Sequence, residues 1–211
     1  MEIAILIFDG LTALDAIGPY EVLSRLPGAD LGFVAKEAGP KRTDTGALGV
    51  EADLALADLD SPEVVLIPGG QGSRPLMRDQ EVLEWLRSAH ASSTWTTSVC
   101  TGALVLGAAG ILDGKRATTH WAFLDHLSEF GAEPVAERVV EDGKVITAAG
   151  VSAGIDMALT LAARIAGDKV AQAIQLGIEY DPDPPFDAGS PSKASSEVIE
   201  MVRTAEPGRP S

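Results

Sequence analysis

The sequence contains no asparagine, and its only cysteine is Cys100. Without asparagine there is no N-glycosylation site, and a Cys-His-Asn catalytic triad of the papain type is excluded. A lone cysteine cannot form a disulfide within the chain. Any chemistry that uses this thiol must therefore rely on other partners.

Basic residues are also scarce: 16 Lys and Arg stand against 31 Asp and Glu, which gives a formal charge of −15. This charge repels phosphate backbones and anionic membrane surfaces, so we expect no nucleic-acid or membrane partner. The longest apolar run, 102–112, is too short to span a bilayer, and the start of the chain has no basic signal-peptide region. These features predict a soluble, cytoplasmic protein that binds a small uncharged ligand.

Metal-binding and phosphate-binding motifs are absent from the sequence as well. No group of Cys, His and carboxylate residues has the spacing of metal ligands, and no Rossmann or Walker loop is present. We therefore expect neither a metal nor a cofactor.

What the chain does contain is an alternation of apolar strand-like runs and segments with helical periodicity. This alternation predicts an α/β sandwich around a largely parallel sheet, and 211 residues suffice for one such domain. Strands are expected at 2–8, 31–36, 64–67, 94–99, 116–119 and in a hairpin of 135–140 with 145–149, besides hairpin-like stretches in 46–56. Helices are expected at 16–26, 79–90, 103–109, 121–130, 152–166 and 169–179.

The tail from Asp181 is rich in Pro, Ser and Gly and shows little periodicity. We expect it to form a surface arm whose last residues are disordered.

Cys100 lies in the segment Ser98-Val99-Cys100-Thr101-Gly102, between a strand-like and a helix-like run. Small residues two before and two after a nucleophile let the backbones approach at a sharp strand-to-helix turn. The N-terminus of the following helix would then favour thiolate over thiol. The alternative is an inert cysteine that packs as a small buried hydrophobe.

In an open parallel sheet, the ligand site lies beyond the carboxyl ends of the strands. This rule brings together Asp15, the turn 68–70, Cys100 with Thr101, and the segments 118–121 and 149–151. The neighbours of Asp15 are apolar, so a carboxylate there would have a raised pKa suited to passing a proton. Its alternative role is to cap the following helix.

The Gly69-Gly70 turn can bring a backbone N–H close to a ligand, and with the Thr101 N–H it would stabilise a developing negative charge. The alternative is an ordinary turn. His120 could reach the same edge, or it could simply pack beside Trp121. Thr101 occupies the position directly after the cysteine, which disfavours a Cys-His protease.

Taken together, these segments resemble the ThiJ/PfpI superfamily, and within it the isonitrile hydratase branch. The resemblance covers about Glu2 to Pro191. The segments that carry it are Asp15, Ile67-Pro68-Gly69-Gly70, Ser98-Val99-Cys100-Thr101-Gly102-Ala103, Ala117-Thr118-Thr119-His120-Trp121, Gly150-Val151-Ser152-Ala153-Gly154-Ile155-Asp156 and the tail segment 179–191. The Cys-Thr-Gly elbow, the Thr-Thr-His-Trp stretch and the Ala-Gly-Ile-Asp helix also recur in the ligand-binding halves of some AraC-type regulators.

The resemblance implies a flavodoxin-like three-layer sandwich, a single glutamine amidotransferase-like domain over 1–191 followed by a partly disordered tail over 192–211, and a homodimer. It implies that Cys100 is the nucleophile and Asp15 its general acid and base. The site would be completed by residues that line the pocket or orient charge, namely Thr101, Gly70, Gly150, Val151, Trp121 and Ile17.

The activity that the resemblance implies is the addition of water to a small apolar isonitrile, which gives an N-substituted formamide without a cofactor. Asp15 and Thr101 stand where many superfamily members use Glu and His, which disfavours protease, deglycase or glyoxalase activity. Two alternatives remain, a cysteine-based redox or stress-response protein and a ligand-binding regulatory module. The chain ends about twenty residues after the matching tail, too few for a helix-turn-helix domain, which counts against a regulator.

Overall fold

The computed structural model describes residues 1–205, so the expected disorder at the end of the tail falls on 206–211, outside the described residues. The chain forms two compact units. The first runs from Met1 to Glu179, and the second begins at Tyr180. The single domain expected over 1–191 stays a prediction. None of the helices within residues 1–205 combines the length and apolar character needed to cross a membrane.

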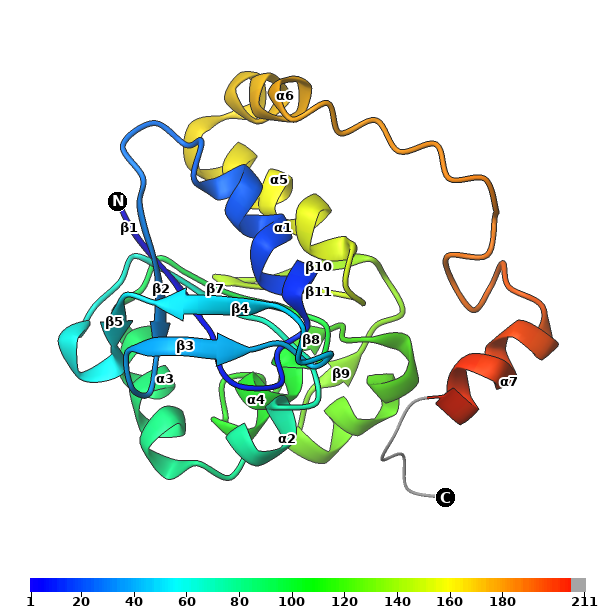
Figure 1. Cartoon of the computed structure of the whole chain (residues 1–211), viewed down its shortest axis with the longest axis horizontal. Coiled ribbons are helices and arrows are strands. Elements are labelled where there is room, and N and C mark those ends of the chain that lie inside the picture. Colours follow the sequence, from blue (N-terminus) through cyan, green and yellow to red (C-terminus); the bar gives the residue numbers. More distant parts are fainter. Residues whose placement is uncertain (206–211) are drawn as a thin grey trace. The chain divides into compact units, whose positions relative to one another are not determined.

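A seven-stranded sheet forms the centre of the first unit, in the order β10-β11-β7-β6-β1-β2-β5 (Figure 1). Every neighbouring pair is parallel except β10 with β11. The largely parallel sheet is therefore confirmed. The strands are β1 (Glu2–Leu6), β2 (Asp30–Ala35), β5 (Leu54–Ala55), β6 (Val64–Ile67), β7 (Trp95–Val99), β10 (Val139–Asp142) and β11 (Val145–Ala148).

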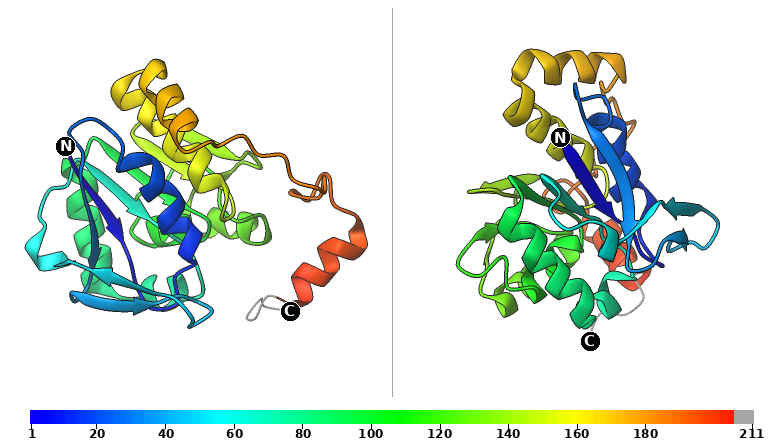
Figure 2. Two further views of the ribbon diagram at one scale, coloured as in Figure 1. Left: turned by 45° about the horizontal axis from the view of Figure 1, so that its top comes forward. Right: turned by 90° about the vertical axis from the view of Figure 1, so that its left-hand side faces the viewer.

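Helices cover both faces of this sheet, which completes the predicted three-layer sandwich (Figures 1 and 2). On one face α1 packs against α5, and α5 against α6; on the other, α4 contacts α2, α3 and η2. Strand β6, Val64–Ile67, is buried along its whole length and is apolar throughout, as is typical of a strand covered on both faces. The helices are α1 (Ala13–Leu23), α2 (Ser73–Leu76), α3 (Gln80–Ser92), α4 (Gly102–Ala108), η2 (Trp121–Phe130), α5 (Ala153–Ala166) and α6 (Asp168–Gly177).

The short elements differ most from the sequence-based expectations. In the 46–56 region, β4 (Gly49–Ala52) pairs with β3 (Gly39–Arg42), a strand that was not predicted. The expected α-helix over 121–130 is a 3-10 helix. The strand expected at 135–140 begins only at Val139, as β10. Strand β8 (Arg116–Ala117) pairs with β9 (Glu133–Pro134), and the short 3-10 helix η1 spans Leu56–Asp58. The pairing of these short strands depends on tertiary contacts that local sequence patterns do not encode.

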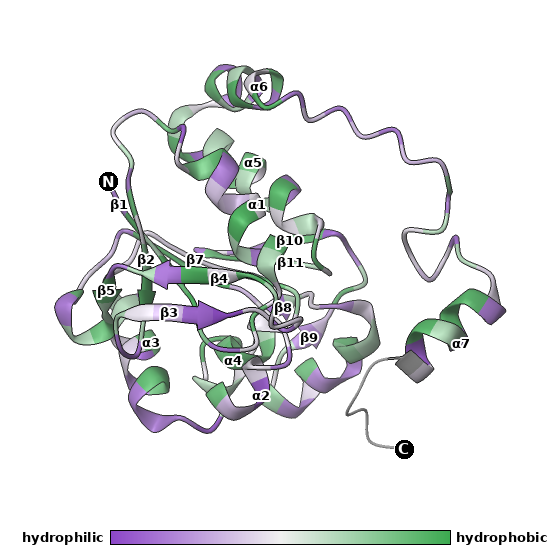
Figure 3. Ribbon diagram, in the orientation of Figure 1, coloured by the Kyte–Doolittle hydropathy of each residue, from purple (hydrophilic) through white to green (hydrophobic). Residues whose placement is uncertain are grey.

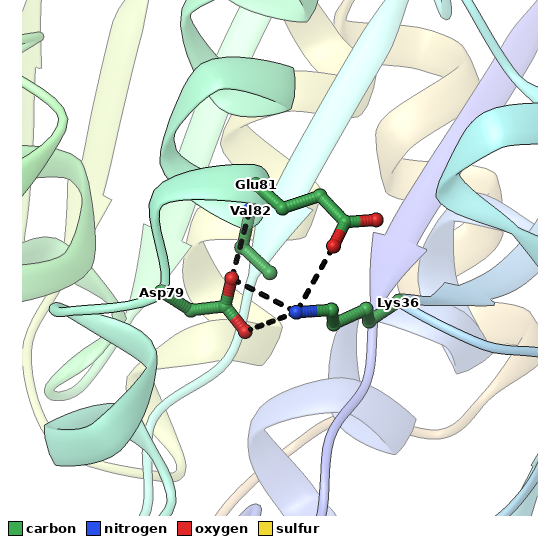
Figure 4. A network of polar contacts seen from close by, with 4 residues as sticks. All are labelled: Lys36, Asp79, Glu81 and Val82. Carbon is green, nitrogen blue, oxygen red and sulfur yellow. Dashed lines mark hydrogen bonds and ion pairs between the residues drawn. The ribbon is translucent and has the colours of Figure 1, made fainter.

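Helix α3 shows how a helix start is anchored to the sheet. Asp79 is its N-cap and accepts a hydrogen bond from the Val82 N–H at 3.4 Å. Lys36, just after β2, donates to both carboxylate oxygens of Asp79 at 3.2 and 2.9 Å, and its Nζ lies 3.0 Å from Glu81 Oε2 (Figure 4). The hydrogen bond from Lys36 lowers the pKa of Asp79. The buried face includes Val82, Leu83 and Leu86, as the periodicity predicted.

The second unit contains helix α7 (Ser196–Ala205), which the analysis of the tail did not anticipate. Its apolar residues Val198, Met201 and Val202 are exposed and recur at helical spacing. Hydrophobic and hydrophilic residues alternate along it (Figure 3). The Ser195 hydroxyl accepts a hydrogen bond from the Val198 N–H at 3.4 Å. The expectation of an irregular tail is thus wrong over Ser196–Ala205, because a short amphipathic stretch follows the Pro-rich segment.

Candidate active site

Cys100 forms a strained elbow between β7 and α4, with a φ of 56° in the left-handed region. Its N–H donates to the carbonyls of Ala148 and Ala149 at 3.1 and 3.0 Å, at the end of β11. Its own carbonyl accepts a hydrogen bond from Thr119 Oγ1 at 2.7 Å. These contacts hold the backbone in a conformation that a non-glycine residue rarely adopts.

Two glycines allow the backbones around the elbow to approach closely. A Cβ at Gly102 would lie 2.1 Å from the carbonyl oxygen of Ile67, and one at Gly69 would lie 2.5 Å from the Thr101 nitrogen. No other residue fits at either position without movement of the backbone. The predicted need for a small residue two positions after Cys100 has this physical basis.

Asp15 lies in the first turn of α1 and is completely buried, with 0% of its surface exposed. Its Oδ2 accepts a hydrogen bond from the Gly69 N–H at 2.8 Å. Within residues 1–205, no N–H or O–H group donates to Oδ1. The N-cap of α1 is Thr12, so the alternative role of Asp15 as a helix cap is wrong.

Burial raises the pKa of Asp15 to about 7. The Gly69 N–H and the hydrogen bond with the Cys100 thiol act in the opposite direction, and the charge of Asp44 raises the pKa further. Asp44 is held close by the Thr12 hydroxyl, which donates to its Oδ2 at 2.7 Å. Asp15 can therefore both accept and release a proton near neutral pH.

Burial also raises the pKa of the Cys100 thiol, and the nearby charge of Asp15 raises it further. Hydrogen bonds from the N–H groups of Thr101 and Val151 and from the Thr101 side chain lower it by less. The prediction of a lowered thiol pKa is therefore wrong, because only 6% of Cys100 is exposed. Cys100 and Asp15 therefore shift each other's pKa, as expected for two neighbouring acidic groups.

Thr101 turns its hydroxyl toward the Gly69-Gly70 turn. The Gly70 N–H donates to Thr101 Oγ1 at 3.0 Å, and Ser73 Oγ lies 3.0 Å from the same oxygen. The N–H of Gly70, which was expected to face the ligand, is thus engaged with Thr101. Ser73 was missed because no motif marks it; its only signal is its position at the start of a helix after the glycine turn.

The loop before α5 forms the opposite wall of the elbow. Val151 has a φ of 36° and directs its N–H to the Cys100 sulfur. A Cβ at Gly150 would lie 2.6 Å from Cδ2 of His120, so that ring packs directly against the loop. His120 also caps η2, since its Nδ1 accepts a hydrogen bond from the Ala122 N–H at 3.3 Å.

The structure therefore brings together Cys100, Asp15, Thr101, Gly70, Gly150 and Val151 at the carboxyl ends of β6, β7 and β11. Trp121 is half-buried, with its ring centroid 5.6 Å from that of His120. Ile17 is half-buried on α1, two residues after Asp15, and packs against the core. The contribution of Trp121 and Ile17 to a substrate pocket remains a prediction.

No cluster of three His, Cys, Asp or Glu side chains in the part of the chain that the structure describes could hold a metal ion. The site is instead built from one thiol, one carboxyl group, a hydroxyl and backbone N–H groups.

A three-layer sandwich with a strained cysteine elbow beside a buried carboxyl group defines the class of this protein. The chain belongs to the DJ-1/PfpI family, which matches residues 1–164. The resemblance to the ThiJ/PfpI superfamily and the predicted fold are thereby confirmed.

Among known proteins, the chain is similar to the isonitrile hydratase of Pseudomonas putida, with 47% identity over 96% of this chain and 89% of that protein. It also resembles the crystal structure of a ThiJ/PfpI family protein from Pseudomonas syringae, with 39% identity, a TM-score of 0.93 and coverage of 96% of this chain and 85% of that one. The HTH-type transcriptional regulator CdhR of Pseudomonas aeruginosa is 32% identical over 78% of this chain and 49% of the regulator.

Proposed function

We propose that this protein is an isonitrile hydratase, an enzyme that adds water to R–N≡C and releases the N-substituted formamide. The observation that carries the proposal is the buried pair of Cys100 and Asp15, which places a nucleophile and a proton carrier side by side. The 47% identity to the isonitrile hydratase of Pseudomonas putida supports the same function.

Hydration of an isonitrile requires a nucleophile and a proton donor that lie next to each other. The terminal carbon of R–N≡C must gain a bond to the nucleophile and a bond to hydrogen, both at the same atom. A general acid at a distance from the nucleophile could not serve, because proton transfer needs hydrogen-bonding reach. The Cys100 thiol and the Asp15 carboxyl group are close enough for each to shift the pKa of the other, so one carbon can contact both.

In the first step, the Asp15 carboxylate accepts the thiol proton as the Cys100 sulfur attacks the terminal carbon. Asp15 then delivers this proton to the same carbon, which gives the thioimidate R–N=CH–S-Cys100. This order suits a buried thiol with a raised pKa, because the thiolate forms only as it reacts.

In the second step, water adds to the thioimidate carbon while Asp15 passes a proton from the water to the nitrogen. The tetrahedral adduct R–NH–CH(OH)–S-Cys100 collapses to R–NH–CHO as the hydroxyl proton returns through Asp15 to the sulfur. The N–H groups of Thr101 and Val151 stabilise charge on the sulfur during both steps. The scheme moves only protons and electron pairs, so it includes no cofactor.

Two further parts of the proposal concern the substrate and the assembly. From the residue types of Trp121 and Ile17 we infer a small, apolar R group in contact with them, and from the family resemblance a homodimer as the active species. Light scattering of the purified protein tests the second point, since a monomer mass would contradict it.

A peroxide sensor is the main rival, and the burial of Cys100 argues against it. Sensor cysteines combine exposure with a low pKa, whereas this thiol is 6% exposed and its pKa is raised. A ligand-binding module would retain the pocket without turnover.

The decisive experiment is conversion of an aryl isonitrile to its N-aryl formamide, followed by chromatography of the product. We expect turnover in the wild type and in Asp79→Ala, a control that removes an aspartate from a helix start outside the site. We expect none in Cys100→Ala or Asp15→Ala, each checked for folding by circular dichroism. Absence of turnover in the wild type would overturn the function, and full turnover in Asp15→Ala would overturn the role of Asp15.

A further inference from the structure

The carbonyl oxygen of Cys100 accepts two hydrogen bonds. The N–H of Ala103, near the start of α4, donates to it at 3.3 Å. The hydroxyl of Thr119 donates to it at 2.7 Å, a typical length for a well-formed O–H···O hydrogen bond. The two bonds occupy both lone pairs of the carbonyl oxygen, and the shorter one comes from a side chain 19 residues away. None of the steps proposed for the reaction assigns a role to Thr119.

Thr119 is itself held in place by the neighbouring strand of the sheet. Its side chain is buried, with 1% of its surface exposed, and the residue before it, Thr118, donates its N–H to the Thr147 hydroxyl on β11 at 2.9 Å. The carbonyls at the end of β11 also accept the hydrogen bonds from the Cys100 N–H. The N–H and the carbonyl of Cys100 are therefore both tied to β11, the carbonyl through residues 118–119.

The carbonyl of Cys100 and the N–H of Thr101 belong to one trans peptide group, so they lie in one plane and point in opposite directions. A hydrogen bond that fixes the carbonyl therefore also fixes the direction of the N–H. Among residues 1–205, no carbonyl group accepts a hydrogen bond from this N–H. Its nitrogen lies against Gly69, where an added Cβ would be 2.5 Å from it and 3.0 Å from Asp15 Oδ2. The Thr101 N–H thus faces the site, away from Thr119.

We propose that Thr119 is a positioning residue that fixes the peptide group between Cys100 and Thr101. It thereby holds the nucleophile in a left-handed conformation, which a residue with a side chain adopts only where its surroundings enforce it. It also keeps the Thr101 N–H directed at the site. The role of Thr119 is indirect, because its hydroxyl bonds to a backbone carbonyl rather than to a reacting atom. The inference rests on the proposed function only for its effect on turnover.

Isonitrile turnover gives the first readout. Thr119→Val keeps the shape of the side chain and removes the hydroxyl. We expect kcat for an aryl isonitrile to fall roughly tenfold while KM stays within about twofold, because the lost hydrogen bond positions the nucleophile rather than the substrate. Thr119→Ser keeps the hydroxyl and should recover most of kcat. A serine variant as slow as the valine variant would overturn the proposal.

The matched control is Thr97→Val, which separates positioning from a general structural role. Thr97 is also a fully buried threonine, and its hydroxyl donates to the Val65 carbonyl at 3.0 Å, on β7 but outside the elbow. The same substitution there removes the same kind of hydrogen bond. We expect the two valine variants to lose similar amounts of thermal stability, and Thr97→Val to keep the kcat of the wild type. An equal loss of kcat in both would overturn the proposal.

Amide hydrogen exchange of the free protein, followed by NMR, tests the positioning role without any substrate. We expect the Cys100 amide to exchange roughly tenfold faster in Thr119→Val than in Thr97→Val, because the freed peptide group opens locally, whereas a general loss of stability affects both variants alike. Equal exchange in the two variants would overturn the proposal.

If Thr119→Val does not fold, Thr119→Ala takes its place, measured against Thr119→Ser. If the protein hydrates no isonitrile, the exchange results still decide the role of Thr119, so the two proposals fail separately.

Discussion

Asp15 and Asp79 are two aspartates at the starts of helices on opposite faces of the sheet, and their pKa values are shifted in opposite directions. Asp79 caps α3, bonds to Lys36, and has a lowered pKa. Asp15 accepts a hydrogen bond from Gly69, outside its own helix, is completely buried, and has a pKa raised to about 7. The same type of side chain thus stabilises the fold in one place and is proposed to carry protons in the other.

The difference comes from what surrounds each carboxylate. Lys36 supplies a positive charge to Asp79, while within residues 1–205 no salt bridge involves Asp15. Two negative charges, those of Asp15 and Asp44, lie near each other instead. A buried acid without a cation is destabilising when ionised, and such groups cluster at functional sites.

The largest expected effect concerns the pH dependence of catalysis. If the singly protonated pair of Asp15 and Cys100 is the active form, kcat/KM for an aryl isonitrile should rise about tenfold per pH unit below pH 7 and level off above it. Asp79→Ala should retain this profile. A profile that is flat between pH 5 and 8 would contradict the assignment of Asp15.

The second effect concerns stability. A carboxyl group whose pKa is raised by folding binds its proton more tightly in the native state, so its contribution to stability falls as pH rises from about 4 through 7. Asp15→Asn removes this loss and should stabilise the protein by up to ~4 kcal/mol at pH 8, but little at pH 4. Thermal unfolding at the two pH values measures the difference. A variant less stable than the wild type at pH 8 would show that the buried Asp15 carboxylate does not destabilise the native state.

A smaller effect of opposite sign is expected for Asp79. Its lowered pKa means that it contributes stability above pH 4 and loses that contribution as the pH falls below this value. Asp79→Ala also removes the cap of α3, which should lower the free energy of unfolding by about 1 kcal/mol at pH 7. The melting temperature reports this change, and Asp79→Ser, which keeps a capping oxygen, should recover most of it.

The smallest effect is expected for Lys36→Ala, because its ion pairs with Asp79 and Glu81 are exposed to solvent. We expect the melting temperature to fall by less than about 2 °C in dilute buffer, and by less still in 0.5 M salt, on the order expected for screened surface pairs. A larger fall would mean that this network stabilises the attachment of α3 to the sheet more than its exposure indicates.

The sequence predicts the strands and the elbow of this protein better than the pKa values and hydrogen bonds of its site. Strand β6 is predicted over 64–67 with its observed ends, because four apolar residues run directly into Pro68-Gly69-Gly70. The elbow at Cys100 is predicted for a similar reason, since Gly102, two positions after the cysteine, has no room for a side chain. These features depend on near neighbours in the chain.

The chemistry of the site depends instead on residues far apart in the sequence. Asp15 could be taken for a helix cap until Gly69, 54 residues away, is seen to donate to it. The helix N-terminus after Cys100 predicts a lowered thiol pKa, and only the folded structure shows that burial outweighs it. Ser73 carries no motif at all, and only the folded structure places its hydroxyl oxygen 3.0 Å from that of Thr101.

The contacts of the Cys100 backbone also bear on engineering. Its N–H is held by the carbonyls of Ala148 and Ala149, its carbonyl by Thr119, and its next residue closes on the Gly69-Gly70 turn. A graft of residues 98–102 alone into another sheet would leave the elbow free to relax into an ordinary turn. The elbow therefore depends on four separate chain segments and the site, with Asp15 on α1, on five, and a designer would have to transplant all of them in register.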